Sequence, residues 1–242
     1  MTTTFIQRLR TFGICAFLLG CPAAIAEGAQ GGPSAAVPPV EQASFHQLMF
    51  ANDDVTVLNN LYSPGGDSGF HAHYRDLFYV VIQSQPQRSQ RPGQPLTAAP
   101  ILPVGAAGYS PSGTEPRVHR VVNGDGGISQ FIVVELRRAS PLGNAMPSRE
   151  AAPQYVPIVD NPRMRAWRLI LEPGQSVPAI VQGGNGVRVV VRGGLLTTTA
   201  PGVPDQTLAL RAGDFAIQKG GATRALRNGG TETIELVEME LK

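Results

Sequence analysis

The second half of the chain repeats the first. Residues 52–73 align without gaps on residues 161–182. A sequence that repeats over such a length predicts two copies of one folded unit, placed one after the other. Between the copies the composition changes to proline and loop-forming residues. We therefore expect a first unit over 44–138, a linker over 139–157 and a second unit over 158–242.

The two copies share turn-forming residues. Pro64–Gly65 falls on Pro173–Gly174, and Asn123 falls on Asn228. In a tight turn, proline presets φ at the first central position and glycine supplies a positive φ at the next. Asparagine caps turns through its side chain. We expect these residues to maintain the fold and to have no part in a functional site.

Short apolar runs separated by glycine and proline follow residue 44, and the chain contains 28 Gly and 21 Pro. Runs of this kind, rich in β-branched and aromatic residues, are typical of strands. A helical period is sustained only over 44–52. The fold class expected is all-β, with strands near 55–62, 77–82, 130–136, 164–171, 187–191, 207–210 and 233–241.

Two of the four histidines, His71 and His73, are separated by a single residue. On a strand, residues i and i+2 project from the same face, so both imidazoles can point into one pocket and share one ion. Two packed or surface histidines that alternate by chance would give the same spacing.

The sequence around this pair resembles a known family. From Gly65 it reads G-x5-H-x-H-x2-D, and from Gly105 it reads G-x5-P-x-G-x5-H-x3-N, ending at Asn123. These stretches resemble the two sequence motifs of the cupin superfamily. The resemblance implies two tandem cupin-type (jelly-roll) β-barrels. It also implies one metal ion in the first barrel, held by His71, His73 and His119.

Asp76 falls where the family has a metal-binding glutamate, so the resemblance makes it the fourth ligand. The sequence departs from the family pattern at two points. Asp76 stands one position early with a side chain one methylene shorter, and five residues separate Gly113 from His119 where the family has two.

The second copy keeps the frame and loses the imidazoles. Ile180 and Gln182 stand at the positions of His71 and His73, and Arg224 stands in place of the third histidine. An arginine cannot be deprotonated in a protein and so cannot bind a metal ion. We expect a metal site in the first unit and a structural second unit. His46, the remaining histidine, is expected to be a surface residue without function.

Three imidazoles and at most one carboxylate suit a divalent transition metal such as Fe, Mn, Zn or Ni. Coordination positions left open would admit a small-molecule ligand or substrate with oxygen donors, or dioxygen. Known cupins with this ligand set include dioxygenases, decarboxylases, isomerases, lyases, and storage or sensor proteins. The resemblance therefore implies a metal without implying a reaction.

Several residues are candidates for roles beside the metal. Asp76, if it is not a ligand, could accept a proton, which makes it a catalytic candidate. Tyr79 could donate a hydrogen bond to a substrate, although a packed aromatic would fit the same position. Arg117 and Arg120 flank His119 and could bind a carboxylate, or they could lie on a solvated loop.

These observations leave three functions open. The first is an exported cupin metalloenzyme of dioxygenase, isomerase, lyase or decarboxylase type that acts on a small oxygen-rich metabolite. The second is a non-enzymatic periplasmic protein that binds a small molecule or a metal. The third is a structural or interaction protein without metal. Resembling proteins often dimerise edge to edge, so a homodimer is an option. No serine-hydrolase, phosphate-loop or dinucleotide motif is present in the sequence.

The N-terminus has the pattern of an export signal. Arg8 and Arg10 precede an apolar run over 12–19, and Ala24–Ile25–Ala26 follows it. Together these predict a signal peptide over 1–26 and an exported, periplasmic or secreted protein. The stretch ending at Cys21 also resembles a bacterial lipobox, which would give a lipoprotein anchored through that residue. We expect residues 27–43 to form a disordered leader.

Cleavage after Ala26 would change what the mature chain can bind. It removes both cysteines, and it removes two arginines and no acids, which takes the formal net charge from +2 to zero. A neutral chain gives no electrostatic reason to expect nucleic acid or an anionic membrane as a partner. We also expect no transmembrane segment in the mature chain.

Overall fold

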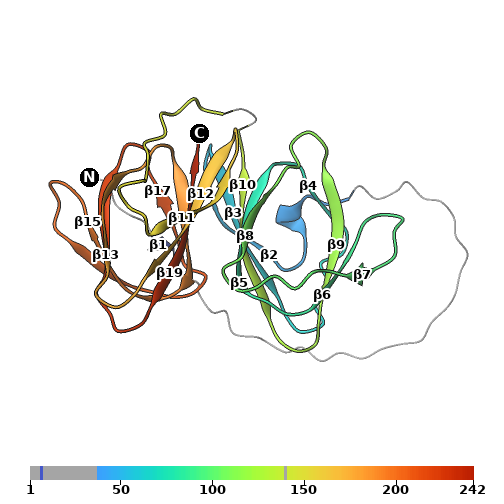
Figure 1. Cartoon of the computed structure of the whole chain (residues 1–242). Helices are drawn as coiled ribbons and strands as arrows, with labels where there is room; N and C mark the ends of the chain where they lie inside the picture. Colours follow the sequence, from blue (N-terminus) through green and yellow to red (C-terminus); the bar gives the residue numbers. More distant parts are fainter. Residues whose placement is uncertain (1–5, 8–36, 139–140) are drawn as a thin grey trace, which may run out of the picture.

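The computed structural model describes residues 6–7, 37–138 and 141–242, and it shows two β-barrels joined in tandem (Figure 1). The prediction of an all-β chain with two jelly-roll barrels is confirmed. The described part of the chain contains one short helical segment, the 3₁₀ turn η1 (Val40–Gln42). Within it, no helix is long and apolar enough to cross a membrane.

The first barrel consists of a five-stranded sheet in the order β2-β3-β10-β5-β8 and a four-stranded sheet in the order β4-β9-β6-β7. Every named pairing in these sheets is antiparallel. The strands are β2 (His46–Ala51), β3 (Val55–Tyr62), β4 (His71–His73), β5 (Leu77–Gln83), β6 (Gln87–Gln90), β7 (Thr97–Ala98), β8 (Ala107–Ser110), β9 (Arg117–Asn123) and β10 (Ser129–Leu136).

The second barrel repeats this topology. Its larger sheet has the order β17-β14-β19-β12-β11, with β1 (Ile6–Gln7) added at the edge beside β17, and its smaller sheet has the order β13-β18-β15-β16. The strands are β11 (Tyr155–Asp160), β12 (Met164–Leu171), β13 (Ser176–Val181), β14 (Gly186–Arg192), β15 (Gly194–Thr199), β16 (Gln206–Leu210), β17 (Phe215–Gln218), β18 (Thr223–Asn228) and β19 (Ile234–Leu241).

The two barrels share one apolar core. Val57, Phe78 and Val134 of the first barrel belong to the same buried cluster as Val189 and Val237 of the second. The central strands of both larger sheets are therefore covered on both faces. This explains why they read as nearly continuous apolar runs and not as alternating ones. Burial of this surface is the main force that holds the barrels together.

The repeated turns form as predicted. The Gly66 N–H donates to Ser63 O across Pro64–Gly65 at 3.0 Å, and Gly65 has a φ of 66°. The second copy closes the same turn over Pro173–Gly174. The Asn123 amide donates to the carbonyl of Gly127, and its partner in the repeat, Asn228, does the same to Glu232. These asparagines stabilise loops.

The element boundaries differ from the sequence prediction at three points. Residues 37–43 of the expected disordered leader are folded, because Val40 packs against Leu58, Leu77 and Val133. Residues 44–52, with their helical period, instead contain strand β2. The expected linker ends early, because β11 begins at Tyr155.

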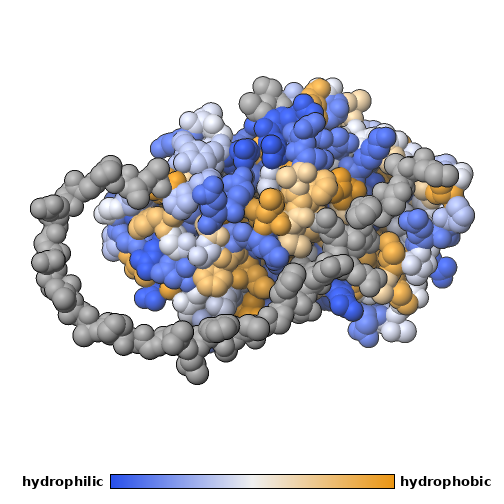
Figure 2. All heavy atoms as spheres, turned by 180° about the vertical axis from the view of Figure 1, so that it is seen from behind, coloured by the Kyte–Doolittle hydropathy of each residue, from blue (hydrophilic) through white to orange (hydrophobic). Residues whose placement is uncertain are grey.

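The signal peptide predicted over 1–26 and the lipobox at Cys21 lie outside the described residues, except for Ile6–Gln7, whose backbone pairs with β17. On the face seen in Figure 2, apolar and hydrophilic residues alternate in patches. Large apolar side chains are exposed on both barrels, for example Leu48, Ile101, Val156 and Val203.

Candidate metal centre

Strands β4 and β9 bring the three predicted histidines together. His71 pairs with His119 across the two strands, and His73 lies two residues further on the same face of β4. The ring centroid of His119 lies 4.5 Å from that of His71 and 5.2 Å from that of His73. The centroids of His71 and His73 are 5.3 Å apart. His71 and His73 are buried, with exposed fractions of 0% and 3%.

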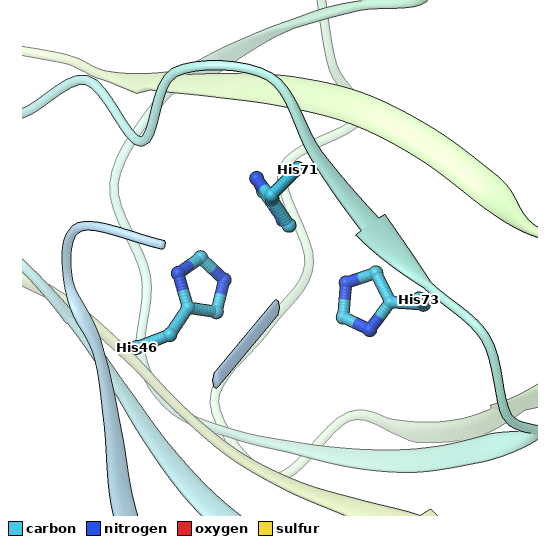
Figure 3. A group of neighbouring side chains, drawn as sticks. All are labelled: His46, His71 and His73. Carbon is cyan, nitrogen blue, oxygen red and sulfur yellow. The ribbon is translucent and has the colours of Figure 1, made fainter. Parts of the chain in front are cut away.

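His46 joins this group from β2 (Figure 3). Its ring centroid lies 4.5 Å from that of His71, and it offers a ring nitrogen within 4.8 Å of those of His71 and His73. The prediction that His46 is a surface residue is wrong, because β2 pairs with β3 and directs the side chain into the barrel. Extending the repeat backwards from residue 52 would have aligned His46 with Tyr155, a buried residue of the second barrel.

The hydrogen bonds of the rings leave nitrogens free for another partner. His71 Nδ1 donates to Gly69 O at 3.1 Å, and its buried Nε2 has no partner among the described residues. Neither ring nitrogen of His119 has a partner there either. Buried polar atoms are almost always hydrogen-bonded or bound to an ion or water. The unpartnered nitrogens and the chemistry of the donors therefore fit a metal ion at this place.

His46 is held differently from the other three histidines. Its Nδ1 donates to Ser44 O at 2.8 Å, and its Nε2 accepts from the Tyr62 hydroxyl at 3.2 Å. Both ring nitrogens are therefore engaged in this arrangement. His46 becomes a ligand only if the Tyr62 hydroxyl gives up its hydrogen bond.

Glu135 on β10 orients His73, a role that the sequence motifs did not predict. Its carboxylate accepts from His73 Nδ1 at 3.2 Å and from Arg75 Nη1 at 3.3 Å, and the residue is 1% exposed. A carboxylate on one ring nitrogen fixes the tautomer and leaves the other nitrogen to bind a metal. The signal for this role was an acidic residue within the apolar run 129–136.

The environment keeps the imidazoles of His46, His71 and His119 neutral. Burial, with the nearby His71, lowers the pKa of His46 to about 3, and burial lowers the pKa of His71 to about 4. Burial and the charge of Arg117 lower the pKa of His119 to about 2. Since only the neutral imidazole can ligate a metal, these three rings are in the ligating form at neutral pH.

Asp76 lies apart from the histidine group. Its carboxylate accepts from the Tyr109 hydroxyl at 2.6 Å, from the backbone N–H of Ser112 and Gly113 at 2.9 Å, and from Arg163 Nη1 at 2.7 Å. Burial alone would raise the pKa of Asp76, but these donors lower it. The sequence predicted Asp76 as a metal ligand or a proton acceptor, but in the structure these four donors engage its carboxylate. This carboxylate instead secures the 109–113 segment and links the two barrels.

A cavity of about 500 Å³ opens beside the histidines. Tyr79 and Arg117 line it, whereas Phe78 points the other way into the shared core. Arg120 is paired with Asp67 and does not line the cavity. The lining also includes His46, His73, His119, Tyr62, Leu77, Leu102, Phe131 and Val133.

The second barrel has no imidazole at the equivalent place. Ile180 pairs with Arg224 across β13 and β18 as His71 pairs with His119 across β4 and β9. Tyr155 pairs with Leu169 where His46 pairs with Asn60. Within the described residues, the group whose possible ligand atoms all lie within 4.8 Å of one another consists of His46, His71 and His73 of the first barrel, and it does not include His119.

Comparison with known proteins gives similarity of fold. No family model and no curated protein sequence matches the chain. Among solved structures, AerE from Microcystis aeruginosa is similar over 85% of this chain and 97% of its own, with a TM-score of 0.62 and 12% identity. A salicylate 1,2-dioxygenase from Pseudaminobacter salicylatoxidans is similar over 84% of this chain and 77% of its own, with a TM-score of 0.56 and 14% identity. A G106A mutant of that dioxygenase, in complex with gentisate, has a TM-score of 0.55 and 13% identity over 85% of this chain and 76% of its own.

Proposed function

Since the chain has the tandem-barrel fold of the cupin superfamily, we propose that it is a metalloenzyme whose first barrel holds a divalent transition metal on His71, His73 and His119. The observation that carries this proposal is that the buried Nε2 of His71 and both ring nitrogens of His119 have no other partner among the described residues, next to a cavity that His73 and His119 line. Fe, Mn, Zn and Ni all suit imidazole ligands. When bound, such an ion polarises an oxygen ligand as a Lewis acid or takes part in redox chemistry with dioxygen.

The chain's own residues prepare this site. Glu135 and the carbonyl of Gly69 hold His73 and His71 with Nδ1 as the donor, so that each Nε2 keeps its lone pair. The apolar side chains of Leu77, Phe131 and Val133 exclude water from the inner wall of the cavity. Opposite charges that meet in such a water-poor cavity attract each other more strongly than they would in bulk water.

The cavity fits a small carboxylic acid with further oxygen donors. Arg117 offers a fork of donors that matches a carboxylate, and Tyr79 offers a hydroxyl. Leu77, Leu102 and Phe131 offer an apolar wall against which a ring can pack. Gentisate, which the similar dioxygenase carries in one of its structures, is such a compound. We propose that the substrate of this protein belongs to the same general class, a hydroxy acid whose carboxylate and hydroxyl groups are carried on an aromatic or other apolar body.

His46 favours a second candidate, a protein that captures a metal without catalysing a reaction. If His46 exchanged its hydrogen bond with Tyr62 for the ion, four imidazoles would surround the metal. Fewer positions would then remain open for a substrate. Under either proposal we place the protein outside the cytoplasm, because the N-terminal sequence has the pattern of an export signal.

Elemental analysis tests the metal, and turnover separates the two candidates. The protein, loaded with Fe, Mn, Zn and Ni in turn, should retain about one equivalent of at least one of them. The variants His71→Ala and His119→Ala should retain almost none, and the matched control Gln182→Ala in the second barrel should retain as much as the wild type. Oxygen uptake with a panel of hydroxybenzoates favours the enzyme. Full metal content with no turnover favours metal capture, and no retained metal contradicts both.

A further inference from the structure

The interior of the second barrel contains a buried cluster of charged residues where the first barrel has its histidines. Glu238 on β19 accepts hydrogen bonds from Arg149 Nη1 at 3.0 Å and from Arg188 Nε at 2.7 Å, and it lies 3.5 Å from Arg224 Nη2. The three arginines are only 5% to 7% exposed, and Glu238 is 1% exposed. Arg149 comes from the connection between the barrels, and its guanidinium lies 3.7 Å from the ring centroid of Trp167.

Positive charge exceeds negative charge in this cluster. Burial alone would raise the pKa of Glu238, but Arg188, Arg224 and Arg149 hold it well below its usual range, so the carboxylate is ionised. Glu240 Oε1 accepts from Arg165 Nε at 2.5 Å, and Glu240 Oε2 lies 3.8 Å from Arg149 Nη2. Two carboxylates, Glu238 and Glu240, are therefore paired with four guanidiniums, those of Arg149, Arg165, Arg188 and Arg224. Unbalanced buried charge is costly, which favours an additional anion as a partner.

Several donors of the cluster are unsatisfied. Arg188 Nη2, Arg224 Nε and Arg149 Nε are buried and have no hydrogen-bond partner among the described residues. The amide nitrogen of Gln182 is in the same condition. Guanidinium groups have five N–H donors in a fixed fork, and carboxylate and phosphate oxygens match this arrangement.

Two arginines of the cluster also line hollows in the barrel. A cavity of about 400 Å³ is lined by Arg224, Lys219 and Gln218, and a hollow of about 20 Å³ is lined by Arg188 and Asp214. Thr198 and Gln206 line both spaces. Asp214 Oδ2 accepts from the backbone N–H of Arg211. The strands β15 to β18, which form these walls, are the counterparts of β6 to β9 around the first cavity.

We propose that the second barrel binds a small organic or inorganic oxyanion in the larger cavity, with its carboxylate or phosphate group held by Arg224 and Lys219. Thr198 and Gln206, which line the same cavity, supply further hydrogen bonds. The site takes its charge complementarity from residues that stand where metal-binding and apolar residues stand in the first barrel. This proposal does not depend on a metal in the first barrel.

Calorimetric titration tests the proposal with phosphate, malonate and benzoate, and with chloride at equal ionic strength as the control. We expect saturable binding of one anion class at one site, and the class that binds identifies the group recognised. Arg224→Gln should weaken the affinity at least about tenfold, because a charge-assisted hydrogen bond is lost. His71→Ala should leave anion binding unchanged while it removes metal, so this site and the metal site fail independently.

Two milder variants keep the test valid if Arg224→Gln does not fold. Thr198→Val removes one hydroxyl at nearly constant volume, and Lys219→Gln removes one charge from the cavity wall. Each should weaken binding by about three- to tenfold. Binding that is absent for all anions, or equal for chloride and the test anions, overturns the proposal. Affinities unchanged in Thr198→Val and Lys219→Gln also overturn it.

Discussion

The two barrels have the same strand order and nearly opposite interiors. In the first, Val133 pairs with Tyr79 across β10 and β5. In the second, Glu238 pairs with Arg188 across the equivalent strands β19 and β14. The first interior thus holds a group of histidines with one buried carboxylate, Glu135, whereas the second holds a cluster of buried arginines and glutamates. The comparison shows that one frame of turns and outer packing tolerates either chemistry inside.

The physical reason for the contrast is the way each group tolerates burial. A buried imidazole becomes neutral through a lowered pKa, so it needs no counter-charge. A guanidinium cannot lose its proton, so each buried arginine needs a carboxylate or another anion. The first barrel therefore responds to protons and metal ions, whereas the second depends on ion pairs.

A fall in pH should produce the largest difference in stability between the two barrels. The folded-state pKa values of His46 and His71 are about 3 and 4, below the usual value of 6.5, so the unfolded chain binds more protons. The stability they contribute is complete above pH 6.5 and is lost as the pH falls toward 4, by up to about 1.4 kcal/mol per pH unit for each group.

Urea unfolding of the metal-free protein at several pH values checks this. Glu238, with a lowered pKa, loses its contribution only below its unfolded value of 4.5, so the decrease between pH 6.5 and 5 belongs to the first barrel. Bound metal should move the decrease to lower pH, because protons must compete with the ion. Stability that is constant from pH 7 to 5 would contradict the neutral, buried state of the histidines.

Glu238→Gln should be the most damaging single change in the second barrel. It leaves Arg149, Arg188 and Arg224 without their shared carboxylate, and breaking a buried ion pair by removing one partner costs about 3–5 kcal/mol. Urea unfolding at pH 7 measures the loss. The matched variant Glu135→Gln in the first barrel should cost about 1–3 kcal/mol, since it removes hydrogen bonds to one histidine and one arginine. Equal losses of unfolding free energy in the two variants would show that both barrels depend on their buried carboxylate to the same extent.

His119→Ala should abolish metal retention with little loss of folding stability, because both nitrogens of that ring are unpartnered without the ion. The reverse change in the second barrel, Arg224→His, should not create a metal site, because Ile180 and Tyr155 still occupy two of the equivalent positions. Elemental analysis of both variants measures this. A second equivalent of metal in Arg224→His would mean that the barrels differ less than proposed.

Glu135→Gln should also weaken metal binding by about 10- to 100-fold, the usual effect of removing a carboxylate that orients a histidine ligand. A competition titration with a chelator measures the affinity. An unchanged affinity would mean that the contact of Glu135 with His73 serves the fold alone. The pair Lys242–Asp160 lies in the second barrel and supplies a control, with Asp160→Asn expected to leave the affinity unchanged.

Asp76→Asn should have the smallest effect on the metal. The carboxylate is occupied by Tyr109, Ser112, Gly113 and Arg163, so we expect unchanged metal content and a loss of about 1–3 kcal/mol in unfolding free energy. The same elemental analysis and urea unfolding apply. Loss of metal in this variant would restore Asp76 as a ligand and contradict the arrangement described above.

The sequence predicted the parts of this protein that depend on local spacing. The repeat gave two equivalent barrels, and the Pro64–Gly65 turn formed because proline and glycine set φ within their own residues. His71 and His73 share a face because a strand alternates its side chains, and the resemblance added His119 in a place that the structure brings close to them. Each of these conclusions needed only a short segment or a comparison of two segments.

Only the tertiary structure decided which polar groups meet. His46 reaches the histidine group because β2 pairs with β3, and Glu135 reaches His73 from 62 positions away. Asp76 is held away from the cluster by Arg163, which belongs to the other barrel. Arg149 enters the second barrel from a segment that looked like a linker. Hydrogen bonds and ion pairs depend on distances of a few ångströms between chain segments, and no local sequence pattern fixes those distances.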